Sequence, residues 1–251
     1  MAENSQSILL SSDPPPVEIV NAGGTSPFLL IGDHAGRLVP SSLAMLGLQP
    51  ADLARHIGWD IGVEALGRVL AARLDAMFVR QRYSRLVVDC NRDPAAPAAM
   101  PAISDETHVP GNAGLSDEAR RRRVAEIHEP YQAAIAAALA ARPDAVLVSL
   151  HSFTPALAGV ARPWHVGVLH NGRNDAFALR LLDWLTQQAG LVVGDNEPYR
   201  MDIVDYTVPR HAFATARPYV EIEVRQDLIA DAAGVDAIAA LLAPGLIAAL
   251  A

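Results

Sequence analysis

The chain has 251 residues, of which 51% are hydrophobic and 19% are charged, a balance that is typical of a globular protein and excludes a disordered one. Its formal net charge of −8 argues against binding to nucleic acid or to an anionic membrane. The single cysteine, Cys90, excludes an internal disulfide and a cysteine-rich zinc site, and its apolar neighbours predict a buried thiol. Because no signal peptide and no apolar run of about 18–20 residues is evident, we expect a cytoplasmic protein.

The first residues differ in character from the rest of the chain. Residues 1–16 are polar and end in three prolines, so we expect a flexible leader there and a single domain over residues 17–251. Short apolar or alternating runs predict strands at about 28–32, 77–82, 86–90, 145–150, 165–170, 191–194 and 219–224. Helical patterns cover about 62–74, 116–141, 174–189 and 234–250. This alternation predicts an α/β fold, with a mixed, mostly parallel sheet and helices on both faces.

Two further stretches have an unusual composition. Residues 93–115 are rich in proline, alanine and glycine, and a loop of that length is commonly a lid, a binding loop or disordered. The four arginines at 120–123 fall in a predicted helix beside Glu118 and Glu126, so we expect them on a solvated helix face.

Polar side chains follow several of the predicted strands. His34 comes after the first strand, Asn91 and Arg92 after the run at 86–90, and His151 after the run at 145–150. Ligands bind at the carboxyl ends of strands in open α/β sheets, so we expect these residues at one sheet edge. Two imidazoles and a carboxylate make a zinc site with three protein ligands and an open position for water.

The carboxylate of that site has two candidates. Asp60, in "HIGWDIG", precedes a predicted helix and could instead cap it. Asp33 could be the ligand in its place, or it could orient an imidazole from behind.

A pair of glutamates marks the last predicted strand. Glu221 and Glu223 alternate with apolar residues in "YVEIEV", so both point to the same face of the sheet. A glutamate beside a metal can move a proton from water to a leaving amine. We favour Glu223 for this role over Glu221, and either one could instead pair with Arg85 or Arg225.

Substrate contacts are expected from the polar loops. Arg92 offers a planar, bidentate donor for a carboxylate, although it could instead pair with Asp89 or Asp93. Further residues that could line the pocket are Tyr199, Arg210 and His211, with Arg210 taken as a candidate for substrate binding.

Six stretches of the sequence resemble the N-formylglutamate amidohydrolase family, which belongs to the zinc carboxypeptidase-like hydrolases. They are "DHAGRLVP", "GWDIG", "RYSRLVVDCNRDP", "LVSLHSFTP", "GDNEPY" and "EIEVRQ", and the resemblance runs from about Pro27 to Gln226. It implies a zinc carboxypeptidase-like (phosphorylase/hydrolase-like) fold, zinc or another divalent metal, and hydrolysis of the amide bond of an N-acyl amino acid.

The resemblance also implies roles for individual residues. The implied metal ligands are His34, Asp60 and His151; the implied substrate-carboxylate pair is Asn91 and Arg92; the implied catalytic residues are Glu223 and Arg85, the arginine polarising the scissile carbonyl. Two features depart from the family pattern. His34 is followed three residues later by Arg37, where the wider superfamily has a glutamate ligand, and this shifts weight to Asp60. The "GDNEPY" segment is typical of a poorly defined branch, so the substrate need not be N-formylglutamate itself.

The leading interpretation is a metal-dependent amidohydrolase that acts on a small acyl amino acid. One alternative is a carboxypeptidase-like hydrolase of short peptides, in which Arg92 would hold the terminal carboxylate. Another is a non-catalytic protein that binds a metal or an acyl amino acid. A phosphate-handling enzyme is disfavoured because no glycine-rich phosphate loop is present.

Overall fold

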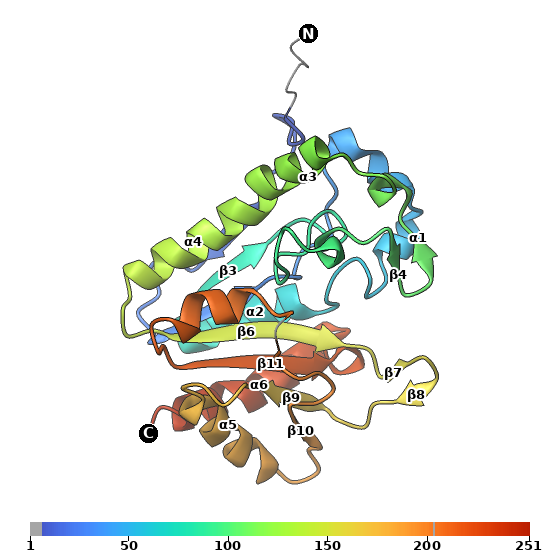
Figure 1. Cartoon of the computed structure of the whole chain (residues 1–251). Helices are drawn as coiled ribbons and strands as arrows, with labels where there is room; N and C mark the ends of the chain where they lie inside the picture. The colour runs from blue at the N-terminus through green and yellow to red at the C-terminus, as the bar shows by residue number, and fades with distance from the viewer. Residues whose placement is uncertain (1–6, 203) are drawn as a thin grey trace.

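Seven strands form the central sheet, in the order β1-β3-β2-β6-β11-β9-β10 (Figure 1). The computed structural model describes residues 7–202 and 204–251. The sheet strands are β1 (Val17–Val20), β2 (Phe28–Gly32), β3 (Met77–Gln81), β6 (Val146–Phe153), β9 (Val166–Leu169), β10 (Val193–Asp195) and β11 (Tyr219–Arg225). Strands β3, β2, β6 and β11 are parallel, whereas β1 and β9 run antiparallel to β3 and β11, and β10 is parallel to β9. The predicted mixed, mostly parallel sheet is therefore confirmed.

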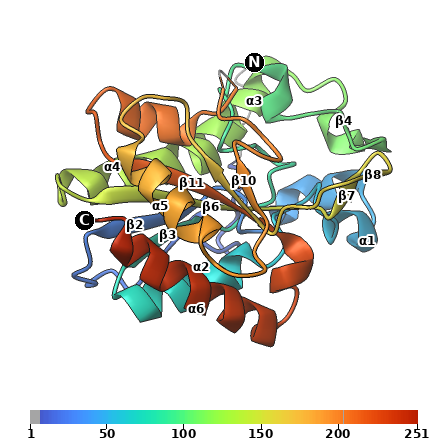
Figure 2. The ribbon, with the colours of Figure 1, turned by 90° about the horizontal axis from the view of Figure 1, so that it is seen from below.

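Helices cover both faces of this sheet, as predicted. They are α1 (Pro50–Leu53), α2 (Val63–Leu74), α3 (Asp117–Arg123), α4 (Glu129–Ala140), α5 (Ala176–Thr186) and α6 (Ala232–Ala248). Figure 1 shows α4 on one side of the sheet and α5 and α6 on the other, and Figure 2 shows α2 beside α6. A π-helical turn, Val124–His128, joins α3 to α4, so the helix predicted over 116–141 is present in three consecutive segments.

The alternation of side chains along the strands divides the core into two layers. Val148 and Leu150 of β6 belong to the apolar cluster beneath α2, α5 and α6, whereas Leu147 belongs to the cluster under α4. The same period places Ser149 and His151 on the α4 side of the sheet. On β11, Tyr219 belongs to the cluster under α4, so Glu221 and Glu223 share that side. One face of two neighbouring strands thus carries the polar residues of the site.

The register between β6 and β11 brings those polar residues together. Glu223 lies opposite His151, and Glu221 lies opposite Ser149. On the other side of β11, Glu223 lies opposite Gly167 of β9. A Cβ atom at Gly167 would come within 2.0 Å of the carbonyl oxygen of Glu197, so only glycine allows the 197–198 segment to pass over the strand here.

The prediction of a strand at 86–90 is wrong. This segment forms turns, in which the amide of Val87 donates to the carbonyl of Ser84 and the hydroxyl of Ser84 donates to the carbonyl of Gly58. The run is apolar because its side chains are buried in the cluster under α4, and periodicity cannot distinguish such a buried turn from a buried strand. Cys90 is buried there, as predicted.

Residues 93–115 form short ordered elements. They contain two 3₁₀ turns, Pro97–Ala99 and Pro110–Asn112, and a hairpin of β4 (Ile103–Ser104) and β5 (Thr107–His108). A second hairpin, β7 (Ala156–Leu157) and β8 (Val160–Ala161), follows β6, and two further 3₁₀ segments span Ser41–Gly47 and Gln226–Ile229, with a π-helical turn at Pro209–Phe213.

The expectation of a fully solvated arginine run is wrong for Arg123. Its guanidinium is buried and donates to the carbonyls of Val87 and Gly111 and to Oδ1 of Asn112. Burial lowers its pKa to about 10. Arg123 therefore ties α3 to the turn at 86–90 and to the loop at 110–112.

The predicted leader divides into two parts. Residues 1–6 lie outside the described residues. Residues 7–16, expected to be flexible, contact the domain instead: the amides of Ile8 and Leu9 donate to the carboxylate of Glu126, and Tyr83 donates its hydroxyl to the carbonyl of Pro14. Ile8 is buried, and this apolar anchor explains why the segment packs despite its polar composition. Among the described helices, none combines the length and the apolar character needed to cross a bilayer.

Candidate metal centre

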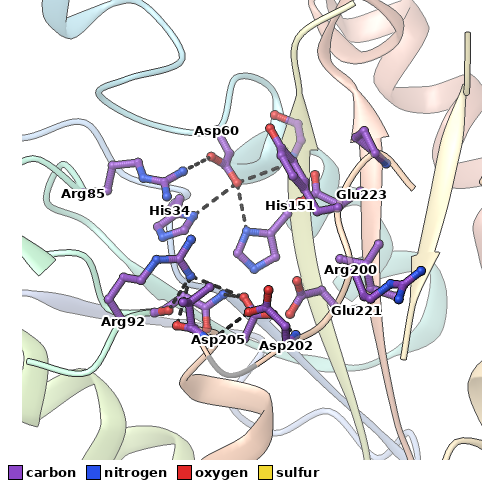
Figure 3. Close-up of a pocket in the computed structure, with 16 residues that line it drawn as sticks. His34, Asp60, Arg85, Arg92, His151, Arg200, Asp202, Asp205, Glu221 and Glu223 are labelled. Atoms are coloured by element: carbon purple, nitrogen blue, oxygen red, sulfur yellow. Dashed lines mark hydrogen bonds and ion pairs between the residues drawn. The ribbon is translucent and has the colours of Figure 1, made fainter. Parts of the chain in front are cut away.

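Three side chains from separate elements meet on the α4 side of the sheet, near the carboxyl ends of β2 and β6 (Figure 3). His34 follows β2, Asp60 lies in the loop before α2, and His151 is part of β6. All three are buried, and each offers a ligand atom within 4.8 Å of the others. Nδ1 of His34 lies 3.4 Å and Nδ1 of His151 lies 3.0 Å from Oδ2 of Asp60. The fold thus brings the three predicted metal ligands together.

The backbone around Asp60 directs its carboxylate into the site. The amide of Asp60 donates to the carbonyl of His34 at 2.9 Å, and the amide of Ser152 donates to Oδ2 of Asp60 at 3.3 Å. The residue at the start of α2 is Gly62, with φ +85°, and the helix has no side-chain cap. Asp60 therefore does not cap α2, which was the alternative role considered from the sequence.

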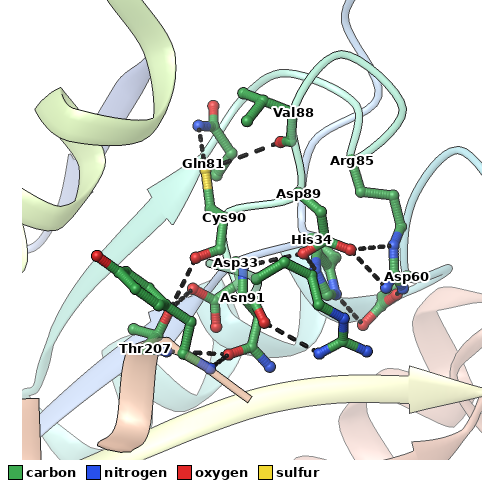
Figure 4. Close-up of polar contacts among 12 residues, drawn as sticks. Asp33, His34, Asp60, Gln81, Arg85, Val88, Asp89, Cys90, Asn91 and Thr207 are labelled. Carbon is green, nitrogen blue, oxygen red and sulfur yellow. Dashed lines mark hydrogen bonds and ion pairs between the residues drawn. The ribbon is translucent and has the colours of Figure 1, made fainter. Parts of the chain in front are cut away.

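Each histidine is held from behind through its other ring nitrogen. Nε2 of His34 lies 2.7 Å from Oδ1 of Asp89 (Figure 4). Nε2 of His151 lies 3.1 Å from Oγ of Ser149 and 3.4 Å from Oδ2 of Asp33. A carboxylate behind an imidazole fixes its tautomer and leaves the opposite nitrogen free to bind a metal. In both rings that opposite nitrogen is Nδ1, and it faces Asp60.

Asp33 occupies the orienting position rather than the ligand position. Its Oδ1 accepts a 2.6 Å hydrogen bond from the hydroxyl of Thr207, and its Oδ2 faces His151 from the Nε2 side. Of the two carboxylates considered from the sequence, Asp60 is the one that lies between the two Nδ1 atoms.

The buried donor set fits a divalent cation. Nδ1 of His34 is buried, lies 3.4 Å from Oδ2 of Asp60 and has no hydrogen-bond partner in the described part of the chain, which is costly unless another group binds it. Two imidazole nitrogens and one carboxylate oxygen, all on one side, are the donors of a three-ligand zinc site. The arrangement can thus hold a metal ion.

Two glutamates of β11 line the same pocket. Glu221 and Glu223 are buried, and within residues 7–202 and 204–251 no hydrogen-bond partner is found for Oε2 of either one. Burial raises the pKa of each carboxyl to about 8, although the charge of His151 lowers it. The charge of Asp60 further raises the pKa of Glu223, and that of Asp205 raises the pKa of Glu221.

Arg85 contacts the acids that surround the histidines. Its guanidinium donates to Oδ2 of Asp89 at 2.8 and 3.1 Å, and it lies 3.4 Å from Oδ1 of Asp60. The pairing with Glu221 or Glu223 considered from the sequence is not formed. Arg225 pairs instead with Asp227.

Asn91 and Arg92 both line the pocket and contact the segment that follows residue 203. Nη1 of Arg92 donates to Oδ1 of Asp205 at 3.3 Å and to the carbonyl of Val204 at 3.2 Å, and the pairings with Asp89 and Asp93 considered above are not formed. Oδ1 of Asn91 accepts the amides of residues 206 and 207 at 2.9 and 3.0 Å. This pair therefore fixes the loop that forms one wall of the site.

The pocket has a volume of about 440 Å³. Its lining residues are His34, Asp60, Arg85, Asn91, Arg92, His151, Ser152, Leu169, Pro198, Tyr199, Arg200, Asp202, Val204, Asp205, Glu221 and Glu223. Arg210 is not among them: it is exposed and donates to the hydroxyl of Tyr206. His211 is also outside and contacts Gln132. Arg210 lies in a π-helical turn, and the prediction from loop-like composition could not reveal which way it points.

Sequence reasoning did not identify several polar residues of the site. Asp202, Asp205 and Arg200 belong to a segment with little regular structure, of which only "GDNEPY" was singled out. Asp89 was considered only as a partner of Arg92. Its spacing, two residues before Asn91, gives no sign that it reaches His34.

Comparison with known proteins agrees with this arrangement. The sequence model of the N-formylglutamate amidohydrolase family matches residues 26–230. The structure of gene product Atu2144 from Agrobacterium tumefaciens is 34% identical, has a TM-score of 0.93, and the match covers 97% of this chain and 98% of that one. N-formylglutamate amidohydrolase from Ralstonia eutropha JMP134 is 20% identical, with a TM-score of 0.66 and coverage of 94% and 97%, and shares the fold. A search of curated proteins gave no match.

The family match spans most of the chain and includes every element that supplies His34, Asp60, His151 and the two glutamates. The fold, the buried donor set and the pocket all agree with it. The chain belongs to the N-formylglutamate amidohydrolase family and is a hydrolase that acts on amide bonds.

Proposed function

We propose that this protein is a zinc-dependent amidohydrolase that releases the acyl group from a small N-acyl amino acid. The observation that carries the proposal is the buried set of His34, Asp60 and His151, with an unpartnered Nδ1 on His34, beside two buried glutamates in one pocket. In a cluster with a purely structural role, we would expect hydrogen-bond partners for Nδ1 of His34 and for the Oε2 atoms of Glu221 and Glu223.

The proposed metal position is defined by the two Nδ1 atoms and by Oδ2 of Asp60. Mixed nitrogen and oxygen donors in a three-ligand set favour zinc. A divalent ion bound there supplies Lewis-acid chemistry, polarising the amide carbonyl and lowering the pKa of water. Asp89 and Asp33 keep the two imidazoles in the tautomer that presents Nδ1.

Glu223 is the proposed proton carrier. It faces His151 across the register, and its unpartnered Oε2 belongs to the pocket lining. As water adds to the carbonyl carbon, Glu223 accepts its proton, and it returns that proton to the nitrogen as the C–N bond breaks. The products are a free carboxylate and the amine of the released amino acid.

Two arginines have proposed substrate contacts. The Nη1 atom of Arg92 donates to Asp205 and to backbone carbonyls, and these contacts fix the plane of the guanidinium. In this orientation Arg92, with Asn91 beside it, can bind the α-carboxylate of the substrate. Arg85 is bound to Asp89 and Asp60, and its side chain remains 26% exposed, so it can also meet the carbonyl oxygen of the scissile amide.

The small pocket favours an acyl amino acid over a longer peptide. A volume of about 440 Å³ suits a small molecule, and residues 198–200, 202, 204 and 205 contribute to its lining. A non-catalytic binding protein is disfavoured because it would have no use for a proton carrier such as Glu223, which lies opposite His151 beside the donor set.

The proposal is tested with a panel of N-formyl, N-acetyl and N-succinyl amino acids and short peptides, incubated with the zinc-loaded protein. We expect release of free amino acid from at least one small acyl amino acid, at a rate that Glu223→Gln lowers by several orders of magnitude. Hydrolysis of peptides alone would favour the carboxypeptidase alternative. Zinc binding without hydrolysis of any compound would favour the binding protein.

A further inference from the structure

The pocket contains one more buried carboxylate than the reaction requires. Proton transfer uses a single glutamate, yet β11 supplies both Glu221 and Glu223 to the same side of the sheet. Glu221 is 3% exposed, and its Oε2 has no hydrogen-bond partner among the described residues. A buried carboxyl oxygen without a hydrogen-bond partner is costly, and a donor group of a bound ligand would satisfy it.

The arginines of the pocket do not pair with Glu221. Arg85 is bound to Asp60 and Asp89, Arg92 is bound to Asp205, and no ion pair joins Arg200 to Glu221, although both line the pocket. A further cation is the imidazolium form of His151, whose charge lowers the pKa of Glu221 and which is itself held by Asp60. Within residues 7–202 and 204–251, no ion pair with Lys or Arg is formed by Glu221. Figure 3 shows its carboxyl group directed toward Asp202 and Asp205, on the side of the pocket where Arg92 also lies.

A second metal ion does not fit these acids. In the part of the chain that the structure describes, only His34, Asp60 and His151 bring three potential ligand atoms within 4.8 Å. The oxygens of Glu221, Asp202 and Asp205 are therefore too widely spaced to form a three-ligand metal site. An ammonium group, which needs one or two oxygens and tolerates a wider spacing, suits them better.

The location of Glu221 indicates which part of a substrate would carry the cation. Glu221 is opposite Ser149 and Leu169, one step further from the carboxyl end of β11 than Glu223. Asp205, which lines the same pocket as Glu221, holds Nη1 of Arg92 at 3.3 Å. The acidic subsite thus adjoins the group proposed to bind the α-carboxylate of the released amino acid.

We propose that the released amino acid carries a side-chain ammonium group, bound by Glu221 with Asp202 and Asp205 nearby, so that the preferred substrates are N-acyl diamino acids. This inference rests on the proposed amidohydrolase function. Glu221 then determines specificity and Glu223 carries the proton.

The test compares three substrates that share an acyl group: Nα-formylornithine, Nα-formylnorleucine and N-formylglutamate. Norleucine replaces the ammonium group of ornithine by a methyl group at nearly equal size. A charge-assisted hydrogen bond in a buried site corresponds to a preference of about 10- to 100-fold in kcat/KM for the ornithine compound. Glu221→Gln should reduce that ratio to near one, with the melting temperature as a check on folding and Glu118→Gln, a substitution on the surface of α3, as the matched control.

Each result bears on the inference. A preference for ornithine that only Glu221→Gln removes supports it. A preference for glutamate over both other compounds overturns it and leaves the amidohydrolase function intact. An equal loss for all three compounds in Glu221→Gln also overturns it, because Glu221 would then serve the chemistry itself.

A binding measurement keeps the two proposals distinguishable. Free ornithine and free norleucine are titrated into the protein by calorimetry, which requires no hydrolysis. Tighter binding of ornithine, lost in Glu221→Gln, supports the subsite even where no acyl compound is cleaved. Equal binding of the two amino acids overturns it.

Discussion

Asp89 offers a sharp test of how the protein prepares His34 for a metal. Its Oδ1 accepts Nε2 of His34 at 2.7 Å and the amide of Asn91 at 2.9 Å, while Oδ2 accepts two N–H groups of Arg85 at 2.8 and 3.1 Å. An asparagine at this position has one oxygen and one NH₂ group. The NH₂ group of Asp89→Asn must therefore face either the guanidinium of Arg85 or Nε2 of His34. In both orientations the negative charge of the carboxylate is lost.

The expected loss concerns metal affinity first. Removing a carboxylate behind a ligating histidine costs 10- to 100-fold in affinity, which is about 1.4–2.7 kcal/mol. The broken ion pair with Arg85 adds a loss in the free energy of unfolding of about 1–3 kcal/mol. Zinc affinity is measured by competition with a chelator of known affinity, and folding by thermal melting of the metal-free protein.

Asp93→Asn is the matched control, because Asp93 is exposed and its carboxylate accepts the amide of Ala95 two residues away. That variant should bind zinc as the unmodified protein does. If Asp89→Asn folds and binds zinc within twofold of the unmodified protein, Asp89 does not prepare His34, and the reasoning fails.

Three further predictions concern other residues. Glu223→Gln should retain zinc and bind substrate but lose several orders of magnitude in kcat, as measured by turnover and metal content side by side; normal turnover in a stable variant would assign the proton transfer elsewhere. Arg92→Lys keeps the charge but loses the planar fork, so KM should rise about tenfold or more for substrates with a free α-carboxylate and little for their amides; equal losses for both would make Arg92 structural. Partial burial raises the pKa of Glu18, but hydrogen bonds and charges from Arg68 and Arg80 dominate and lower it to about 2 from its usual 4.5. Because the folded pKa is depressed, these contacts stabilise the protein above about pH 4.5, and the stabilisation is lost as the pH falls toward 2. Glu18→Gln should thus lower the melting temperature at pH 7 by a few degrees, and the difference should vanish near pH 2; a gap that is constant with pH would contradict the pairing.

Local patterns in the sequence account for most of the sheet and the main helices. The alternation in "YVEIEV" correctly predicted that Glu221 and Glu223 share one face, since side-chain direction along a strand depends only on the period. The same logic failed at 86–90, where burial from all sides gave an apolar run without a strand. The half-buried β1 was missed because Glu18 interrupts its apolar character.

The candidate site was predictable only in part, because its supporting contacts join residues that are far apart in the sequence. His34, Asp60 and His151 were identified because each lies within a family-like motif, and the two histidines also follow predicted strands. Their supporting contacts, such as Asp89 behind His34, join residues 55 positions apart and depend on turns that no local pattern encodes. The position of Arg210 outside the pocket likewise depends on the packing of its helical turn.

The metal content of the purified protein tests the central claim most directly. After removal of adventitious metal and reloading with zinc, elemental analysis should find about one zinc ion per chain, and replacing both His34 and His151 by alanine should abolish it while the fold is retained. Full occupancy in the double variant, or no tightly bound zinc in the unmodified protein, would contradict the account.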